Sequence, residues 1–146
     1  MGRIRVAGIV PMEDGFAFMH RVDVKKRRDY QNYYTFPGGG VEEDETPEEG
    51  TIREIKEEFG IQVKVIKKLY EMESEKFDQK EIFYLCEYVD GEFGTGNGPE
   101  FNNDPKYIDS GKYLPEIVKR KEIKNLLLLP FEIKEMFIKD IEENVI

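Results

Sequence analysis

A glycine-rich turn followed by a capped helix is the feature that most constrains the fold of this chain. Gly38–Gly40 is a run of glycines, which lets the backbone adopt conformations barred to other residues. The segment Pro47–Phe59 is predicted to form a helix, because Thr46 is a good N-cap and Glu49 completes a Thr-x-x-Glu capping box. Gly60 is expected to end the helix. The turn and the helix should therefore form one unit with defined ends.

One face of the predicted helix is acidic. Glu54, Glu57 and Glu58 have i, i+3, i+4 spacing and share an arc of roughly 100°. The opposite side carries the apolar residues expected to face the core, Ile52, Ile55 and Phe59. Like charges at this spacing need relief, either from solvent and neighbouring Lys and Arg or from a bound cation. Arg53 lies four residues before Glu57 and can pair with a carboxylate, and carboxylate oxygens are ligands that Mg²⁺ and Mn²⁺ prefer.

Strands and helices interleave along the rest of the chain. Strands are predicted at Ile4–Val10, Phe16–His20, Tyr33–Phe36, Ile61–Ile66, Lys80–Val89 and Tyr113–Lys119, and a second helix at Pro130–Glu143. Gly91–Gly111 is rich in Gly, Asn, Asp and Pro and is expected to be a loop, and a loop of this length is often functional. We expect an α/β fold with a mixed sheet and helices on its faces, in a single domain that covers residues 1–146.

Composition and charge limit the class of protein and its location. The longest apolar run, Leu126–Leu129, is too short to cross a bilayer, and the first residues do not resemble a signal peptide. Cys86, the single cysteine, is expected to be a packed core thiol, and a cytoplasmic location follows as the default. The net charge of −9 argues against binding of duplex nucleic acid, which usually requires a basic stripe.

The segment from Gly39 to Ile61 resembles the complete Nudix box. Gly39 is followed after five residues by Glu45, and after seven more by Arg53–Ile61, with every specified position matched and no gap. The flanking pattern fits more loosely. The resemblance implies an α/β/α sandwich around a mixed sheet, in which the box forms a loop–helix–loop. It also implies a hydrolase that uses Mg²⁺ or Mn²⁺ and cleaves a nucleoside diphosphate linked to another group.

The resemblance also implies roles for residues of the box. Glu57 and Glu58 would be the main metal ligands, and Glu54 would be a ligand or the base that activates water. The main-chain carbonyl of Gly39 would be a further ligand, and Arg53 would orient a glutamate through a salt bridge. Supporting roles would fall to Glu45 in the loop and to Ile55 and Ile61 against the core. Such a site needs no serine, cysteine or histidine nucleophile.

Further candidates lie outside the box. Family members often bring another catalytic or metal-binding glutamate from a later loop, and Glu100 is our candidate, with Glu116 as runner-up; both could equally be surface acids. Arg21 follows the second strand, where the family often places an arginine that contacts phosphate. Tyr34 and Phe36 could stack on a base, but they share one strand face, so at least some of the aromatic residues here belong to the core.

The substrate remains open at this level, because the box reads the pyrophosphate and not the attached group. The expected partner is a nucleotide-like small molecule: a nucleoside triphosphate, ADP-ribose or another nucleotide sugar, a dinucleoside polyphosphate or a capped RNA end. No convincing base-reading asparagine lies in Leu126–Phe137, which weakens a role in removing oxidised guanine nucleotides. The alternative function is a catalytically silent Nudix-fold module that binds nucleotides, although such modules usually have a damaged box. A homodimer is also possible as the oligomeric state, since nothing in the sequence fixes an interface.

Overall fold

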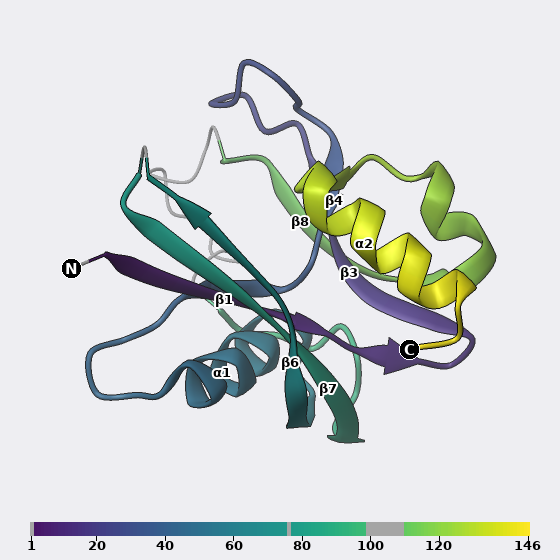
Figure 1. Ribbon diagram of the computed structural model, residues 1–146, viewed down its shortest axis with the longest axis horizontal. Coiled ribbons are helices and arrows are strands. Elements are labelled where there is room, and N and C mark those ends of the chain that lie inside the picture. Colours follow the sequence, from purple (N-terminus) through teal and green to yellow (C-terminus); the bar gives the residue numbers. More distant parts are fainter. Residues whose placement is uncertain (1, 76, 99–109) are drawn as a thin grey trace.

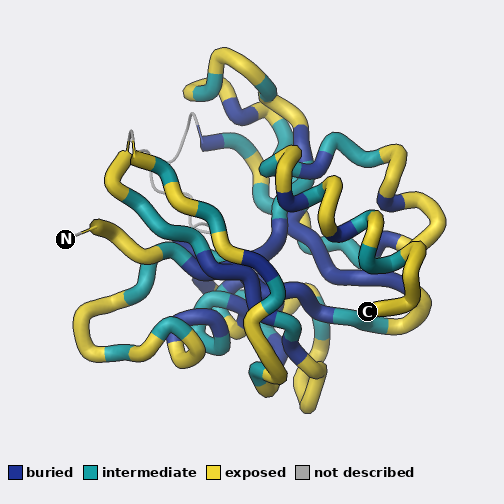
Figure 2. The backbone as a smooth tube through the Cα atoms, viewed as in Figure 1, coloured by how far each residue is buried: buried dark blue, intermediate teal, exposed yellow. Residues whose placement is uncertain are grey.

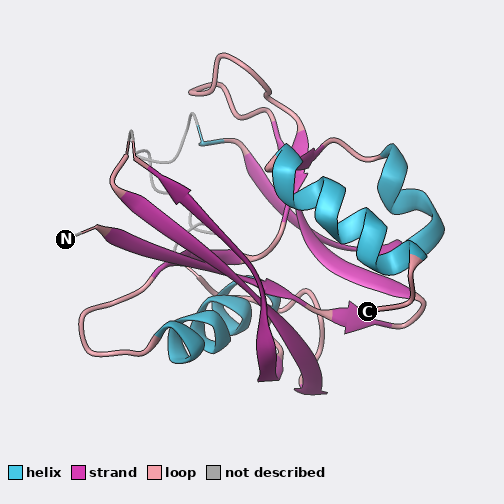
Figure 3. Ribbon diagram, in the orientation of Figure 1, coloured by secondary structure: helices cyan, strands magenta, loops and turns pink. Residues whose placement is uncertain are grey.

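Strands make up most of the regular structure, and the computed structural model describes residues 2–75, 77–98 and 110–146 (Figures 1 and 3). The strands are β1 (Arg3–Ile9), β2 (Pro11–Met12), β3 (Gly15–Val22), β4 (Tyr33–Thr35), β5 (Gly38–Gly40), β6 (Gln62–Ser74), β7 (Gln79–Asp90), β8 (Lys112–Lys119) and β9 (Leu128–Leu129). The helices are α1 (Pro47–Phe59) and α2 (Phe131–Glu142), and a 3₁₀ segment covers Arg120–Asn125. In the described part of the chain, no helix is long and apolar enough to span a bilayer.

The strands form two mixed sheets rather than the single sheet that the sequence suggested. The first sheet has the order β5-β1-β7-β6, in which β1 and β7 are parallel and the other pairs are antiparallel. In the second sheet, β3 pairs along its length with β8 and on its other side with β2 and β4. β4 in turn pairs in parallel with β9. Pro11 lies where the chain passes from one sheet to the other, and proline has no N–H with which to extend the ladder of β1.

The two helices pack into different cores, α1 against the first sheet and α2 against β9 and the core that both sheets line, which gives the expected α/β/α layering (Figure 1). The side chains of β1 alternate between the two cores. Val6 packs in one buried cluster with Ile55 and Phe59 of α1, whereas Ile9 packs in the other cluster with Phe137 of α2. Figure 2 shows the central strands as the most buried part of the chain, with exposed loops around them. The alternation of β1 therefore places α1, and the acidic face it carries, on one defined side of the sheet.

Most predicted elements are confirmed, including both bounds of α1 and the burial of Cys86, whose thiol has its pKa raised to about 12 by burial. The largest error is β6, which extends to Ser74 although the strand was predicted to end at Ile66. The pairing of β6 with β7 contains register shifts between Val65 and Lys67 and between Lys68 and Tyr70. Such bulges interrupt the alternation of side chains, and an edge strand also carries many polar residues. The hydrophobic periodicity of the sequence therefore does not predict the part of β6 beyond Ile66.

Gly8 is the point at which β1 and α1 approach most closely. A Cβ atom on Gly8 would lie 2.4 Å from Cδ1 of the fully buried Ile55. Gly8→Ala is therefore expected to lower the free energy of unfolding by about 1 to 3 kcal/mol. Ile55→Val removes Cδ1 and should cost about 0.5 to 1.5 kcal/mol alone.

In the double variant, the total loss of unfolding free energy should be smaller than the sum of the two single losses, because valine vacates the space that the new methyl group needs. Denaturant unfolding of the wild type, the two single variants and the double variant measures this. Additive losses would contradict a direct contact between β1 and α1 at this point.

Candidate active site

The loop before α1 and the first turn of the helix are held together by reciprocal hydrogen bonds. The backbone N–H of Glu49 donates to Oγ1 of Thr46 (3.1 Å), and the N–H of Thr46 donates to the Glu49 carboxylate (2.8 Å). At the other end, Gly60 has a φ of 76° and donates its N–H to the Lys56 carbonyl. This is the capping box and glycine end that the sequence predicts, so the bounds of the helix follow from local chemistry.

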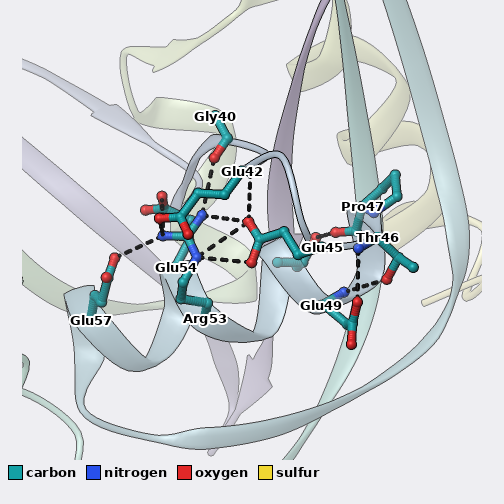
Figure 4. Close-up of polar contacts among 10 residues, drawn as sticks. Gly40, Glu42, Glu45, Thr46, Pro47, Glu49, Arg53, Glu54 and Glu57 are labelled. Carbon is teal, nitrogen blue, oxygen red and sulfur yellow. Dashed lines mark hydrogen bonds and ion pairs between the residues drawn. The ribbon is translucent and has the colours of Figure 1, made fainter.

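Arg53 connects the loop, the helix and β5 (Figure 4). Its Nε and Nη2 donate to the Glu45 carboxylate at 2.7 to 3.2 Å, and Nη2 also donates to the Gly40 carbonyl at 3.0 Å. Its Nη1 donates to Glu54 at 3.0 Å and to Glu57 at 3.1 Å. The predicted pair between Arg53 and Glu57 is thus present. One guanidinium fixes two carboxylates of the acidic face relative to the loop that precedes it.

The charges in this network stabilise each other. The hydrogen bonds from Arg53 lower the pKa of the Glu45 carboxyl, and the Glu45 carboxylate in turn raises the pKa of Arg53. Glu45 also accepts a hydrogen bond from the N–H of Glu42 at 2.9 Å. Charge-assisted, bidentate contacts of this kind hold side chains in place more firmly than neutral hydrogen bonds do. Glu45 therefore secures the loop and Arg53 together.

Backbone of the glycine turn lies directly against the glutamates. The N–H of Gly38 donates to Oε2 of Glu58 at 2.8 Å, and Glu58 is buried. A Cβ atom on Gly39 would lie 2.5 Å from Oε1 of Glu54 and 2.7 Å from its carboxyl carbon. Only glycine leaves room for the Glu54 carboxylate at this position. The turn and the acidic face thus form a single oxygen-rich surface.

The oxygen atoms of the glycine turn and of the acidic face suit a hard divalent cation. In residues 2–75, 77–98 and 110–146, no three His, Cys, Asp or Glu side chains converge closely enough to form a metal site as they stand. Arg53 instead bridges Glu54 and Glu57. The three carboxylates and the backbone of Gly39 nonetheless offer oxygen ligands, and the missing side chain of Gly39 leaves the Glu54 carboxylate close to the backbone.

A cleft of about 1020 Å³ opens beside the acidic face, between the two sheets and the start of α2. The box contributes Gly39, Glu54 and Glu58 to its lining, and Gly38, just before the box, lines it as well. Arg21, at the end of β3, faces the cleft from the second sheet and stacks on Tyr113, with 3.6 Å from its Cζ to the ring centroid. Its Nη2 donates to the Ser110 carbonyl at 2.5 Å. The structure therefore brings Arg21 to the same cleft as the glutamates.

The other candidates outside the box are placed differently. Phe36 lines the cleft but is only 4% exposed, and its ring packs against Phe137. Tyr34 stacks on His20 with ring centroids 4.1 Å apart, and it is not among the residues that line the cleft. Glu116 is hydrogen-bonded to His20 and accepts a longer bond from the Tyr34 hydroxyl. Glu100 lies outside the described residues.

Sequence reasoning missed the polar wall that β1 and β7 give to the cleft. Arg3 and Arg5 of β1 and Gln79 and Glu81 of β7 line it. The available signal was the alternation of arginine with apolar residues at the start of the first strand. A parallel pairing between strands 76 residues apart is not visible in a local pattern.

Comparison with known proteins places this geometry in a family. Residues 2–116 match the NUDIX domain family model. The chain is 33% identical over 113 residues to the 8-oxo-dGTP diphosphatase of Haemophilus influenzae, which covers 75% of this chain and 81% of that protein. It is 53% identical over 45 residues to an RNA pyrophosphohydrolase of Marinomonas sp., but this match covers only 29% of this chain and 28% of that one. The chain therefore belongs to the Nudix family.

Solved structures share the fold. A Nudix hydrolase from Nitrosomonas europaea superposes with a TM-score of 0.70 at 18% identity, over 97% of this chain and 71% of that one. The MutT protein of Methanosarcina mazei gives 0.65 at 23% identity, over 97% and 94%. Together with the family match and the curated relatives, these findings define the chain as a Nudix hydrolase, an enzyme that acts on diphosphate bonds.

Glu45→Gln is expected to destabilise the fold by about 1 to 3 kcal/mol at pH 7, because it weakens charge-assisted hydrogen bonds to Arg53. Since the pKa of Glu45 is lowered from 4.5 on folding, its contribution is present above pH 4.5 and is lost as the pH falls through its folded-state pKa. Denaturant unfolding at several pH values measures the difference from wild type. Glu43→Gln, at an exposed position of the same loop, serves as control. An equal loss at pH 3 and pH 7 would contradict this account.

Gly39→Ala is expected to lower activity at least about tenfold while the protein stays folded, because the added methyl group displaces the Glu54 carboxylate. Gly40→Ala is the matched control, since its Cβ atom would meet only the end of the Arg3 side chain at 3.2 Å. Turnover and thermal unfolding of both variants test this. Equal activity of the two variants would show that the close approach at Gly39 has no functional role.

Proposed function

We propose that this chain hydrolyses the phosphoric anhydride bond of a nucleoside diphosphate linked to another group, with Mg²⁺ or Mn²⁺ as cofactor. The observation that carries the proposal is the bridge from Arg53 to Glu54 and Glu57, which fixes the acidic face at the edge of a large cleft. An acidic surface alone would repel an anionic phosphate. A bound cation resolves this conflict, because it neutralises the phosphate and uses the carboxylates as ligands.

The residues of the box would divide the work. Glu57, Glu58 and the carbonyl of Gly39 would hold the metal, and Glu54 would either join them or accept a proton from the attacking water. When bound, the cation supplies charge neutralisation of the phosphate oxygens and lowers the pKa of its water. Glu58 is held for this role by the N–H of Gly38, and Glu54 lines the cleft, where a water and a substrate can meet.

Arg21 would contact a substrate phosphate from the opposite wall. Its Nε is buried and has no hydrogen-bond partner among the described residues, while stacking on Tyr113 and the bond to Ser110 hold the guanidinium in position. A buried donor without a partner is costly, and an anionic oxygen would satisfy it. We assign Phe36 to the floor of the cleft, because its ring is almost fully buried against the core.

A nucleoside triphosphate is the first substrate to test, because the similarity to an 8-oxo-dGTP diphosphatase covers 75% of this chain. Nucleotide sugars, dinucleoside polyphosphates and 5′-triphosphate RNA belong in the same panel, since shorter similarities are to RNA pyrophosphohydrolases. The alternative, a silent nucleotide-binding module, is disfavoured by the intact set of glutamates in the box.

The test is product release from this panel with Mg²⁺ and with Mn²⁺. Glu57→Gln should lower turnover by at least about a hundredfold, because it removes a metal ligand, while Glu43→Gln should not change it. Isothermal titration with Mn²⁺ should show binding by wild type and its loss in Glu57→Gln. Metal binding without turnover of any member of the panel would favour the silent module, and turnover unaffected by Glu57→Gln would overturn the mechanism.

A further inference from the structure

A charged pair lies on the wall of the cleft outside the box. Arg5 of β1 and Glu81 of β7 are register partners on adjacent parallel strands, and 3.9 Å separates Nε of Arg5 from Oε2 of Glu81. Their side chains are 33% and 25% exposed, and both residues line the cleft that contains Glu54 and Glu58. The pair thus presents a hydrogen-bond donor and an acceptor side by side to whatever enters the cleft.

Glu81 is poorly satisfied by the protein itself. Within the described ranges, its carboxylate accepts no hydrogen bond, and the contact with Arg5 is too long to be one. Burial raises the pKa of Glu81, and the nearby Arg5 offsets only part of this effect. A half-buried carboxylate that lacks donors costs free energy, and a ligand that donates hydrogen bonds to it would recover that cost.

The position of the pair suits the base of a nucleotide whose phosphates lie at the box. Arg5 is the register partner of Gly40 on β5 and of Glu81 on β7, so the three residues form a row across the sheet. Two strand spacings, about 10 Å, therefore separate Glu81 from the strand that carries Gly39. This separation is comparable to the reach from the β-phosphate of a nucleotide to the far edge of its base.

Aromatic side chains line the same cleft. Phe77, just before β7, is 67% exposed, and Phe131, at the start of α2, is 43% exposed. Single exposed apolar side chains are common on protein surfaces, but these two rings belong to the lining of the cleft, and their flat faces are suited to stacking on a base. The cleft therefore offers aromatic rings on which a base can stack and a polar pair that can form hydrogen bonds with the edge of the base.

We propose that Arg5 and Glu81 recognise the Watson–Crick edge of guanine, so that the enzyme prefers guanine nucleotides. This inference rests on the proposed function only in that the same cleft takes a nucleotide. Guanine presents one acceptor, O6, beside two adjacent donors, N1–H and N2–H. Arg5 donates to O6, and the two oxygens of Glu81 accept from N1–H and N2–H. Adenine, cytosine and uracil do not offer two adjacent donors to a carboxylate.

Binding of GMP and of IMP in metal-free buffer tests the proposal without any turnover. The two nucleotides differ only in the 2-amino group, which Glu81 is proposed to bind. Wild type should bind GMP at least about tenfold more tightly than IMP, as expected for loss of part of a bidentate contact. Glu81→Gln should reduce the ratio to about one, whereas Glu87→Gln, an exposed glutamate of the same strand, should keep it.

The wild-type ratio decides the matter even if Glu81→Gln fails to fold. Equal affinity for GMP and IMP, or no binding of GMP, would overturn the proposal. A preference for GMP that survives in a folded Glu81→Gln protein would overturn it as well, because the pair would then be only a structural ion pair. The ratio of kcat/KM for GTP and ITP should follow the binding ratio.

Failure of the proposed function gives a different pattern. A protein that discriminates GMP from IMP through Glu81 but shows no metal-dependent hydrolysis would support the guanine site and contradict the hydrolase mechanism. A protein that hydrolyses nucleotides through Glu57 without base preference would contradict the guanine site and support the mechanism.

Discussion

The guanidinium of Arg53 is the interaction on which the site depends. It contacts Glu45 in the loop, Glu54 and Glu57 on the helix, and the carbonyl of Gly40 on β5. Arginine suits this place because it stays charged and offers several donors in a fixed plane. Without it, the carboxylates of the loop and of the helix, which carry like charges, would lose the cation that they share. The acidic face is therefore ordered by the chain itself, before any metal is considered.

The strand β1 explains why the cleft lies where it does. Its residues alternate, so Arg3, Arg5, Ala7 and Ile9 share one face and Val6 and Gly8 share the other. On the first of these faces, Ala7 and Ile9 pack in the core shared with α2, whereas Arg3 and Arg5 line the cleft. The other face stays apolar and packs against α1. One strand thus seats α1 and also forms a wall of the cleft.

The parts that could be predicted from the sequence are those determined by local chemistry. The ends of α1 follow from Thr46, Glu49 and Gly60, and the pair of Arg53 and Glu57 follows from helical spacing. The division into two sheets, the length of β6 and the meeting of Arg5 with Glu81 depend on pairing between distant strands. Bulges hide such pairing, because they break the alternation that a sequence pattern relies on. The box was therefore predictable, whereas the wall that faces the substrate was not.

This difference has a physical basis that bears on how substrates are chosen. In the mechanism that we propose, the box handles the pyrophosphate, which every candidate substrate shares, and contacts within one segment of the chain hold Arg53 and its partners in place. The wall is built from β1 and β7, and in the described residues the side chains of Arg5 and Glu81 pair with each other rather than with the carboxylates of the box. Substitutions at these two positions can thus alter base recognition while Arg53 continues to hold the glutamates. Substrate preference in this chain is therefore carried by residues that the family motif does not contain.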